Sequence, residues 1–336
     1  MKFSAAQFLF TLSLVALAIT TCSSNLPFVF TAAGDYGLTN DAAATLEGIG
    51  RTGTRLHLAL GDLSYGGPHS ETKWCDFVKS KVGSNLVVEL VAGNHEEDFE
   101  NDGYIRNFAA CLPDRMNSTG VYGKEYYFDL RGLARFIMIS PDLTLDGEHY
   151  FYGRLNNQYT KHYTWLANAI DGARSAHIPW IIVGMHKSCL SVGQYYCNIY
   201  QELFSLLIDK KVDLVLQAHD HGYQRTNQIA TGPACPIVEV DTFNSNCVVR
   251  NAQKNVYLKG AGPIFVITAA GGGELYELNE RDPEAGYFAT WMGANSKPRK
   301  GFARFTMTAS QISGEFVGST ATSDYTDHFT IVKSLP

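Results

Sequence analysis

Five short apolar runs, each followed directly by polar residues, constrain the fold of this chain more than any other feature of its sequence. The runs are rich in Val, Ile, Leu and Phe, which is typical of buried strands. Open α/β sheets bind ligands beyond the carboxyl ends of their strands, so the polar residues that follow the runs mark the expected site. They are GDYG (34–37), GDLSY (61–65), GNHE (93–96), GMHKS (184–188) and AHDHGYQR (218–225).

Helical patterns alternate with these runs over the first two thirds of the chain. Helices are predicted over 40–50, 71–80, 157–174 and 199–211, and two paired strands over 125–140. From about residue 237 strand patterns dominate, beginning with PIVEV (236–240). This order predicts an α/β (α+β) fold in which two mixed sheets pack together with helices outside. We expect one domain over residues 26–336.

The doublet His219 and His221 illustrates how a weak pattern gains meaning from its context. Residues i and i+2 of an extended chain project to the same side. An isolated HxH is nevertheless more often one packed and one solvated histidine than a metal site. Together the strand ends offer carboxylate, phenol, amide and imidazole groups, from Asp35, Asp62, Tyr65, Asn94, His186, His219 and His221.

This donor set contains no thiolate and suits iron, zinc or manganese better than Cu(I) or an iron–sulfur cluster. A carboxylate such as that of Asp62 can bridge two cations. Paired metals of this kind clamp the attacking and leaving oxygens of a phosphoryl displacement. We therefore expect a two-metal site and a small-molecule phosphoester substrate. The net charge of −6 and the absence of a basic block argue against a nucleic-acid partner.

The N-terminal segment predicts entry into the secretory pathway. One lysine precedes an apolar stretch from Phe8 to Ile19, which is typical of a signal peptide occupying about residues 1–22. The alternative is an uncleaved anchor, but the stretch is shorter than the ~20 residues that a membrane span needs. We expect a protein that is secreted or at the cell surface, without a membrane span after signal removal. Asn117 lies in an NST glycosylation sequon.

Six cysteines follow the leader, an even number that suits disulfides in a secreted chain. Cys189 with Cys197, and Cys235 with Cys247, are close enough in sequence to close local loops. Cys75 and Cys111 then remain for each other. Six cysteines allow fifteen connectivities, and spacing alone leaves the others open.

The ordered set of five motifs resembles the metallophosphoesterases of the calcineurin-like superfamily, and the tyrosine of GDLSY resembles purple acid phosphatases, here in a short form without the plant N-terminal β-domain. The resemblance implies a four-layer αββα sandwich and a binuclear centre of Fe(III) with Fe(II), Zn(II) or Mn(II). In that centre Asp62 would bridge the metals. Fe(III) would be held by Asp35, Tyr65 and His221, and the divalent metal by Asn94, His186 and His219.

The activity implied by the resemblance is that of an acid phosphatase, which hydrolyses phosphate monoesters with a metal-bound hydroxide as nucleophile. His95 would contact the phosphate or protonate the leaving alcohol, and Glu96 would orient an imidazole. His69 and Arg225 are further candidates for substrate contact, although Arg225 is equally suited to bracing its loop.

The sequence departs from the family pattern at two places. Ala218 stands where the family has glycine in GHxH. The further histidines that better-known members carry after the fourth motif are absent, and the segment KSCLSVGQYYCN offers Tyr195 and Tyr196 instead. Substrate contact is therefore expected to be arranged differently in this chain.

Two other functions compete with a monoester phosphatase. A phosphodiesterase of the same superfamily, acting on nucleotides or sphingomyelin, would use the same metals without needing Tyr65. A secreted metal-binding protein without hydrolytic activity is the second alternative, although the complete set of donors argues against a decayed site.

Overall fold

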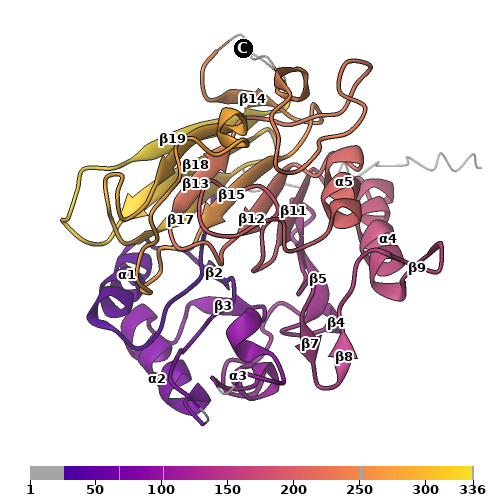
Figure 1. Ribbon diagram of the computed structural model, residues 1–336. Coiled ribbons are helices and arrows are strands. Elements are labelled where there is room, and N and C mark those ends of the chain that lie inside the picture. Colours follow the sequence, from indigo (N-terminus) through magenta and orange to yellow (C-terminus); the bar gives the residue numbers. More distant parts are fainter. Residues whose placement is uncertain (1–25, 68, 101, 250–252, 335–336) are drawn as a thin grey trace, which may run out of the picture.

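The computed structural model describes residues 26–334 apart from 68, 101 and 250–252, so the predicted signal peptide lies outside the described residues (Figure 1). The first of two large sheets has seven strands in the order β14-β19-β18-β17-β1-β2-β3. Strands β1, β2 and β3 run parallel to one another. The strands are β1 (Phe28–Ala33), β2 (Leu56–Ala59), β3 (Val87–Leu90), β14 (Val256–Leu258), β17 (Gly301–Met307), β18 (Gln311–Gly318) and β19 (Asp327–Val332).

The second sheet has eight strands in the order β16-β13-β15-β12-β11-β6-β5-β4. Its centre, β15-β12-β11-β6, is parallel. The strands are β4 (Thr119–Val121), β5 (Glu125–Leu130), β6 (Ala134–Met138), β11 (Trp180–Gly184), β12 (Leu214–Gln217), β13 (Tyr223–Thr226), β15 (Ile264–Thr268) and β16 (Phe288–Met292). Two small hairpins pair β7 (Thr144–Leu145) with β8 (Glu148–His149), and β9 (Arg154–Leu155) with β10 (Gln158–Tyr159).

Helices cover the outside of both sheets. Helices α1 (Asn40–Arg51), α2 (Glu71–Val82) and α3 (Ile105–Cys111) lie together near β2 and β3, whereas α4 (Lys161–Ser175) and α5 (Gln201–Asp209) accompany the second sheet (Figure 1). The hydroxyls of Thr39 and Thr160 accept hydrogen bonds from the first turns of α1 and α4 and so fix where these helices begin.

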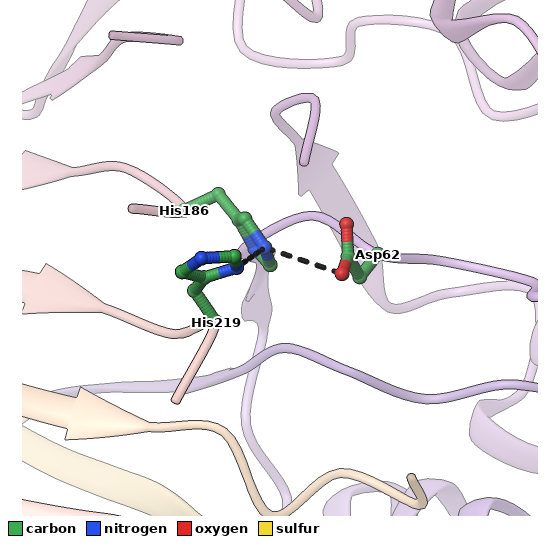
Figure 2. Close-up of side chains that lie close together, drawn as sticks. All are labelled: Asp62, His186 and His219. Carbon is green, nitrogen blue, oxygen red and sulfur yellow. Dashed lines mark hydrogen bonds and ion pairs between the residues drawn. The ribbon is translucent and has the colours of Figure 1, made fainter. Parts of the chain in front are cut away.

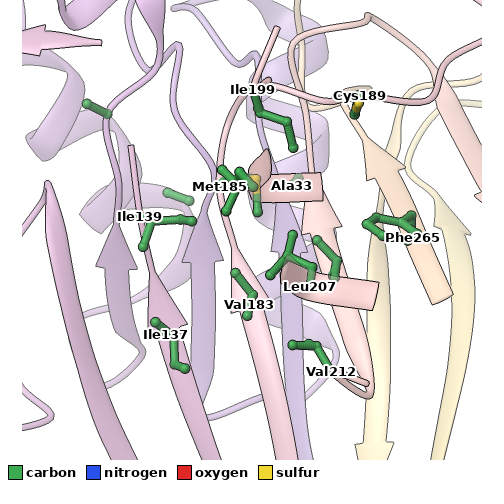
Figure 3. Close-up of a cluster of buried hydrophobic side chains, with 14 of the residues drawn as sticks. Ala33, Ile137, Ile139, Val183, Met185, Cys189, Ile199, Leu207, Val212 and Phe265 are labelled. Carbon is green, nitrogen blue, oxygen red and sulfur yellow. The ribbon is translucent and has the colours of Figure 1, made fainter. Parts of the chain in front are cut away.

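Alternating side chains along the strands build two apolar layers. Between the sheets, Phe30 of β1 meets the edge of Phe136 of β6, with ring centroids 5.0 Å apart. The neighbouring residue Ile137 faces away from this interface and belongs to the cluster that includes Val183 of β11 and Leu207 of α5 (Figure 3). Because successive strand residues point to opposite faces, each sheet presents apolar side chains on both faces, one toward the other sheet and one toward the helices. The αββα layering agrees with the prediction.

The structure differs from the sequence prediction at several elements. Residues 236–240 (PIVEV) do not form a strand: Pro236 has no N–H for a ladder, and the segment belongs to the loop closed by the Cys235–Cys247 disulfide. The short helix α3 and the edge strand β16 were not predicted. Among the described residues, no helix is both long and apolar enough to cross a membrane.

Glu89 of β3 makes the fold sensitive to pH. The side chain is 0% exposed, and burial raises the pKa of its carboxyl to about 8. The folded state therefore favours the protonated form, and stability is lost as the pH rises from the unfolded pKa of 4.5 through about 8.

We predict that Glu89→Gln removes this loss. The free energy of unfolding of each protein is compared between pH 5 and pH 8. The fall in the wild type from pH 5 to pH 8 should exceed any fall in the variant by up to ~4 kcal/mol. Urea titrations at both pH values measure the difference. Equal slopes with pH for the two proteins would contradict the assignment to Glu89.

Candidate metal centre

The seven predicted donors lie on loops at the carboxyl ends of parallel strands from both sheets. Asp35 follows β1, Asp62 and Tyr65 follow β2, and Asn94 begins the 3₁₀ turn η1 (Asn94–Glu96) after β3. From the second sheet, His186 follows β11, and His219 and His221 follow β12. Figure 2 shows Asp62 facing His186 and His219 across the space between the two sets of loops.

Four of these donors have a left-handed backbone, in which φ is positive. The values are +61° for Asp35, +51° for Asp62, +46° for Tyr65 and +70° for His219. Such conformations are uncommon for residues other than glycine, and they persist only where the surroundings enforce them, often at functional sites. The fold thus accepts local strain to aim these side chains.

One group of donor atoms surrounds the phenol of Tyr65. Its oxygen lies 3.1 Å from Asp35 Oδ1, 3.2 Å from Asp62 Oδ2 and 3.1 Å from His221 Nε2. His221 Nε2 also lies 3.1 Å from Asp35 Oδ1. We call these four side chains the tyrosine half-site.

A second group surrounds His186 Nε2. This nitrogen lies 3.1 Å from Asn94 Oδ1, 3.2 Å from His219 Nδ1 and 3.3 Å from Asp62 Oδ2. We call it the histidine half-site. Asp62 Oδ2 belongs to both half-sites, which is the position of a bridging carboxylate.

The spacing and chemistry of the donors fit two cations. Ligands about 2.1 Å from one metal and at right angles to each other lie roughly 3 Å apart, close to the separations within each half-site. Oxygen and imidazole donors without thiolate suit iron, zinc and manganese. The residues that would hold one ion are Asp35, Tyr65, His221 and Asp62, and those for the other are Asn94, His186, His219 and Asp62.

Backbone carbonyls set the orientation of two imidazoles. His186 Nδ1 donates to Leu60 O at 2.7 Å, and His221 Nδ1 donates to Glu274 O at 2.6 Å. Each ring therefore turns Nε2 toward the cluster, as metal-binding histidines usually do when the other nitrogen is engaged. His219 has the opposite orientation: Nδ1 faces His186, and Nε2 faces the Asn198 amide at 3.3 Å.

The electrostatics of the cluster favour a cation. Burial opposes ionisation of Asp62, but the charge of His186 prevails and holds the pKa of Asp62 below its usual range. Burial and the charge of His186 lower the pKa of His219 to about 2. Asp62 and His219 are thus in the protonation states that bind a metal. By contrast, Asp62 and Asp35 raise the pKa of the buried His186 to about 9, so a bound cation would take the place of the His186 proton.

His95 is held by a carboxylate that the sequence analysis missed. Its Nδ1 lies 2.5 Å from Asp102 Oδ2, and its Nε2 lies 3.8 Å from Asp62 Oδ2. The Asp102 backbone and side chain also contact Ser64 and Gly67, in the loop that carries Tyr65. Asp102 lies seven residues after His95 in an acidic segment, and nothing in its spacing signals this contact.

Glu96 does not orient an imidazole, which corrects the expectation for this residue. Its carboxylate accepts hydrogen bonds from the backbone N–H groups of Asp62, Leu63 and Gly93, at 2.8–2.9 Å. It therefore joins the second and third motif loops to each other.

The histidine doublet reaches both half-sites, but not through an extended chain. Strand β12 ends at Gln217, and His219 takes a left-handed conformation. Asp220 between the histidines turns to the loop of the Cys189–Cys197 disulfide, where it accepts hydrogen bonds from Ser191 Oγ and Gln194 N. The doublet thus places one imidazole in each half-site while its middle residue fastens the neighbouring loop.

The remaining candidates differ in where they lie. Tyr195 stacks on His219, whereas Tyr196 is 78% exposed and His69 is exposed before α2. Of the two roles left open for Arg225, the structure favours bracing: the side chain is fully buried, and its guanidinium pairs with Asp327 of the other sheet at 2.6 Å. Asn117 is exposed, and its glycosylation stays a prediction.

Two sequence features find a physical explanation in the packing. A Cβ on Gly34 would lie 2.6 Å from Ala218 Cβ, so the glycine makes room for the alanine that departs from the family pattern.

The six cysteines form the pairs Cys75–Cys111, Cys189–Cys197 and Cys235–Cys247. This pairing is the one preferred from the sequence.

We predict that Gly93→Ala lowers the metal content of the purified protein. The backbone of Gly93 has a φ of −102°, which any residue can adopt, but a Cβ at this position would collide with the Asp62 backbone and carboxylate. Displacing the shared carboxylate should weaken both half-sites, as metal analysis per chain would show. Gly232→Ala, whose Cβ meets nothing within 4 Å, is the control. Wild-type metal content in Gly93→Ala would contradict the role given to Asp62.

Comparison with known proteins identifies the family of the chain. Residues 28–223 match the family described as calcineurin-like phosphoesterase. Among curated relatives, purple acid phosphatase 18 of Arabidopsis thaliana is 26% identical over 274 residues, covering 78% of this chain and 59% of the relative. Fe(3+)-Zn(2+) purple acid phosphatase 12 of the same plant is 28% identical over 287 residues, covering 79% and 55%.

The solved structures give the same fold. The purple acid phosphatase PPD1 from yellow lupin seeds superposes with a TM-score of 0.64 at 20% identity, covering 91% of this chain and 54% of the lupin chain. This chain thus spans a little over half the length of these relatives. Since the family match covers more than half of the chain, the protein belongs to the calcineurin-like phosphoesterase family and has purple acid phosphatases among its homologues.

Proposed function

We propose that the protein is a secreted phosphatase that hydrolyses phosphate monoesters at a binuclear metal centre. The observation that carries this proposal is the tyrosine half-site, in which the Tyr65 phenol touches two carboxylates and an imidazole. A pair of bound metals would activate water and neutralise charge on the phosphoryl oxygens. The name of the Fe(3+)-Zn(2+) relative supports a mixed iron–zinc pair. In our proposal Fe(III) binds in the tyrosine half-site, and Zn(II), Fe(II) or Mn(II) binds in the other.

His95 supplies acid–base chemistry in this proposal. Asp102 fixes the ring through Nδ1, so Nε2 points toward the carboxylate of Asp62 that the two half-sites share. From there Nε2 can donate a proton to the leaving oxygen. Glu96 keeps the loops of His95 and Asp62 together and thereby fixes the distance between these two residues.

Secretion is part of the proposal and is supported by two observations. The structure contains three disulfides, which persist in oxidising compartments. The sequence begins with an apolar segment typical of a signal peptide.

The direct test uses the purified protein, metal analysis and a phosphoester panel. We expect two metals per chain, a visible phenolate-to-iron absorption band, and faster turnover of p-nitrophenyl phosphate than of bis(p-nitrophenyl) phosphate. Tyr65→Phe should lose the band because it lacks the phenol oxygen. Turnover of the bis-ester alone would favour a phosphodiesterase, and two metals without any turnover would favour a metal-binding protein.

We further predict that His95→Ala retains both metals and loses about 10²–10⁴ in kcat, the usual contribution of a general acid. Asp102→Asn should lower kcat by a smaller factor with little change in KM, because it misorients the ring without removing it. Steady-state kinetics and metal analysis provide the readouts. Full kcat in His95→Ala would exclude the acid role.

A further inference from the structure

Two tyrosines stack on ligand imidazoles, one in each half-site. The Tyr195 ring lies 3.9 Å from the His219 ring at an interplanar angle of 23°. The Tyr276 ring lies 4.1 Å from the His221 ring at 5°. Tyr276 comes from the loop after β15, a segment that the sequence analysis did not connect with the site.

The backbone holds both tyrosines in place. Tyr195 N lies 3.4 Å from the Asp220 carboxylate, which also binds the preceding N–H, and the Cys189–Cys197 disulfide closes the loop. Tyr276 N donates to His221 O at 2.9 Å, and Ala294 N donates to Tyr276 O at 2.8 Å. The two rings are therefore fixed parts of the cluster.

The two phenols converge on the outer side of the cluster. Their ring centroids are 6.1 Å apart at an angle of 61°, so the two side chains are neighbours. Both tyrosines are partly exposed, whereas His219 and His221 are buried beneath them.

Lys187, the one lysine between His186 and Tyr200, binds Asp142. Lys187 Nζ donates to the Asp142 carbonyl at 2.8 Å and lies 3.5 Å from the Asp142 carboxylate. The charged donor nearest in sequence to His186 is thus engaged by Asp142, and Tyr195 and Tyr276 offer phenol O–H donors on this flank.

We propose that the hydroxyls of Tyr195 and Tyr276 donate hydrogen bonds to the non-bridging oxygens of the phosphoryl group, from the flank of the cluster opposite His95. His95 comes from the loops of the first sheet, and the tyrosines come from the loops of the second. Fixed donors aimed at phosphoryl oxygens both bind the substrate and stabilise charge as it develops. This inference rests on the proposed phosphatase function and names the residues that contact the phosphate.

Binding of inorganic phosphate to the metal-loaded protein, measured by calorimetry, tests the inference without relying on turnover. Tyr195→Phe and Tyr276→Phe keep the stacked rings and remove only the hydroxyls. Each should weaken phosphate binding about tenfold, with unchanged metal content. The double variant should lose less than the product of the two factors, because the phenols contact each other. Tyr196→Phe, in the same loop and 78% exposed, should bind phosphate as the wild type does.

Two results would overturn the inference. One is wild-type phosphate affinity in both Phe variants. The other is a Tyr276→Phe variant that binds phosphate as the wild type does, together with a Tyr276→Leu variant that loses metal. That result would mean that Tyr276 only supports the His221 ring. If the wild type binds phosphate but hydrolyses no monoester, the proposed function fails while the phosphate-binding comparison still decides the role of the tyrosines.

Discussion

Asp62 Oδ2 touches both half-sites, and the geometry of the whole metal centre follows from the position of this oxygen. This one oxygen lies 3.2 Å from the Tyr65 phenol and 3.3 Å from His186 Nε2, so it joins a half-site built mostly on one sheet to one built mostly on the other. Buried charge of this kind is costly unless it is compensated. The compensation comes from imidazoles, backbone N–H groups and, in our proposal, two cations.

The surrounding loops serve to hold that oxygen in place. Glu96 accepts three backbone hydrogen bonds and fastens the Asp62 loop to the Gly93 loop. Asp220 does the equivalent for the second sheet by fastening the disulfide loop beside His219. Glu96 and Asp220 are both buried carboxylates that lie close in sequence to the donors. The hydrogen-bond network therefore runs without a break from the donor side chains to the loops that carry them. Local strain at the left-handed donors is accepted because this network fixes their backbone.

Much of the fold and of the candidate site could be predicted from local sequence. Apolar runs gave the strands, and the rule that ligands bind beyond strand ends located the donors from Asp35 to His221. Contacts between distant segments were not predictable. Asp102 reaches His95, and Tyr276 reaches His221, only through folding. For Glu96 the residue was identified but its partner was not, because backbone N–H groups leave no signal in a sequence.

A crystal structure of the protein grown with added Zn²⁺ or Mn²⁺, with anomalous scattering recorded at the metal edges, would show whether Asp62 bridges two metals. We expect two ions, one among Asp35, Tyr65 and His221 and one among Asn94, His186 and His219, both in contact with Asp62. A single ion, or a second ion that Asp62 does not touch, would contradict this expectation.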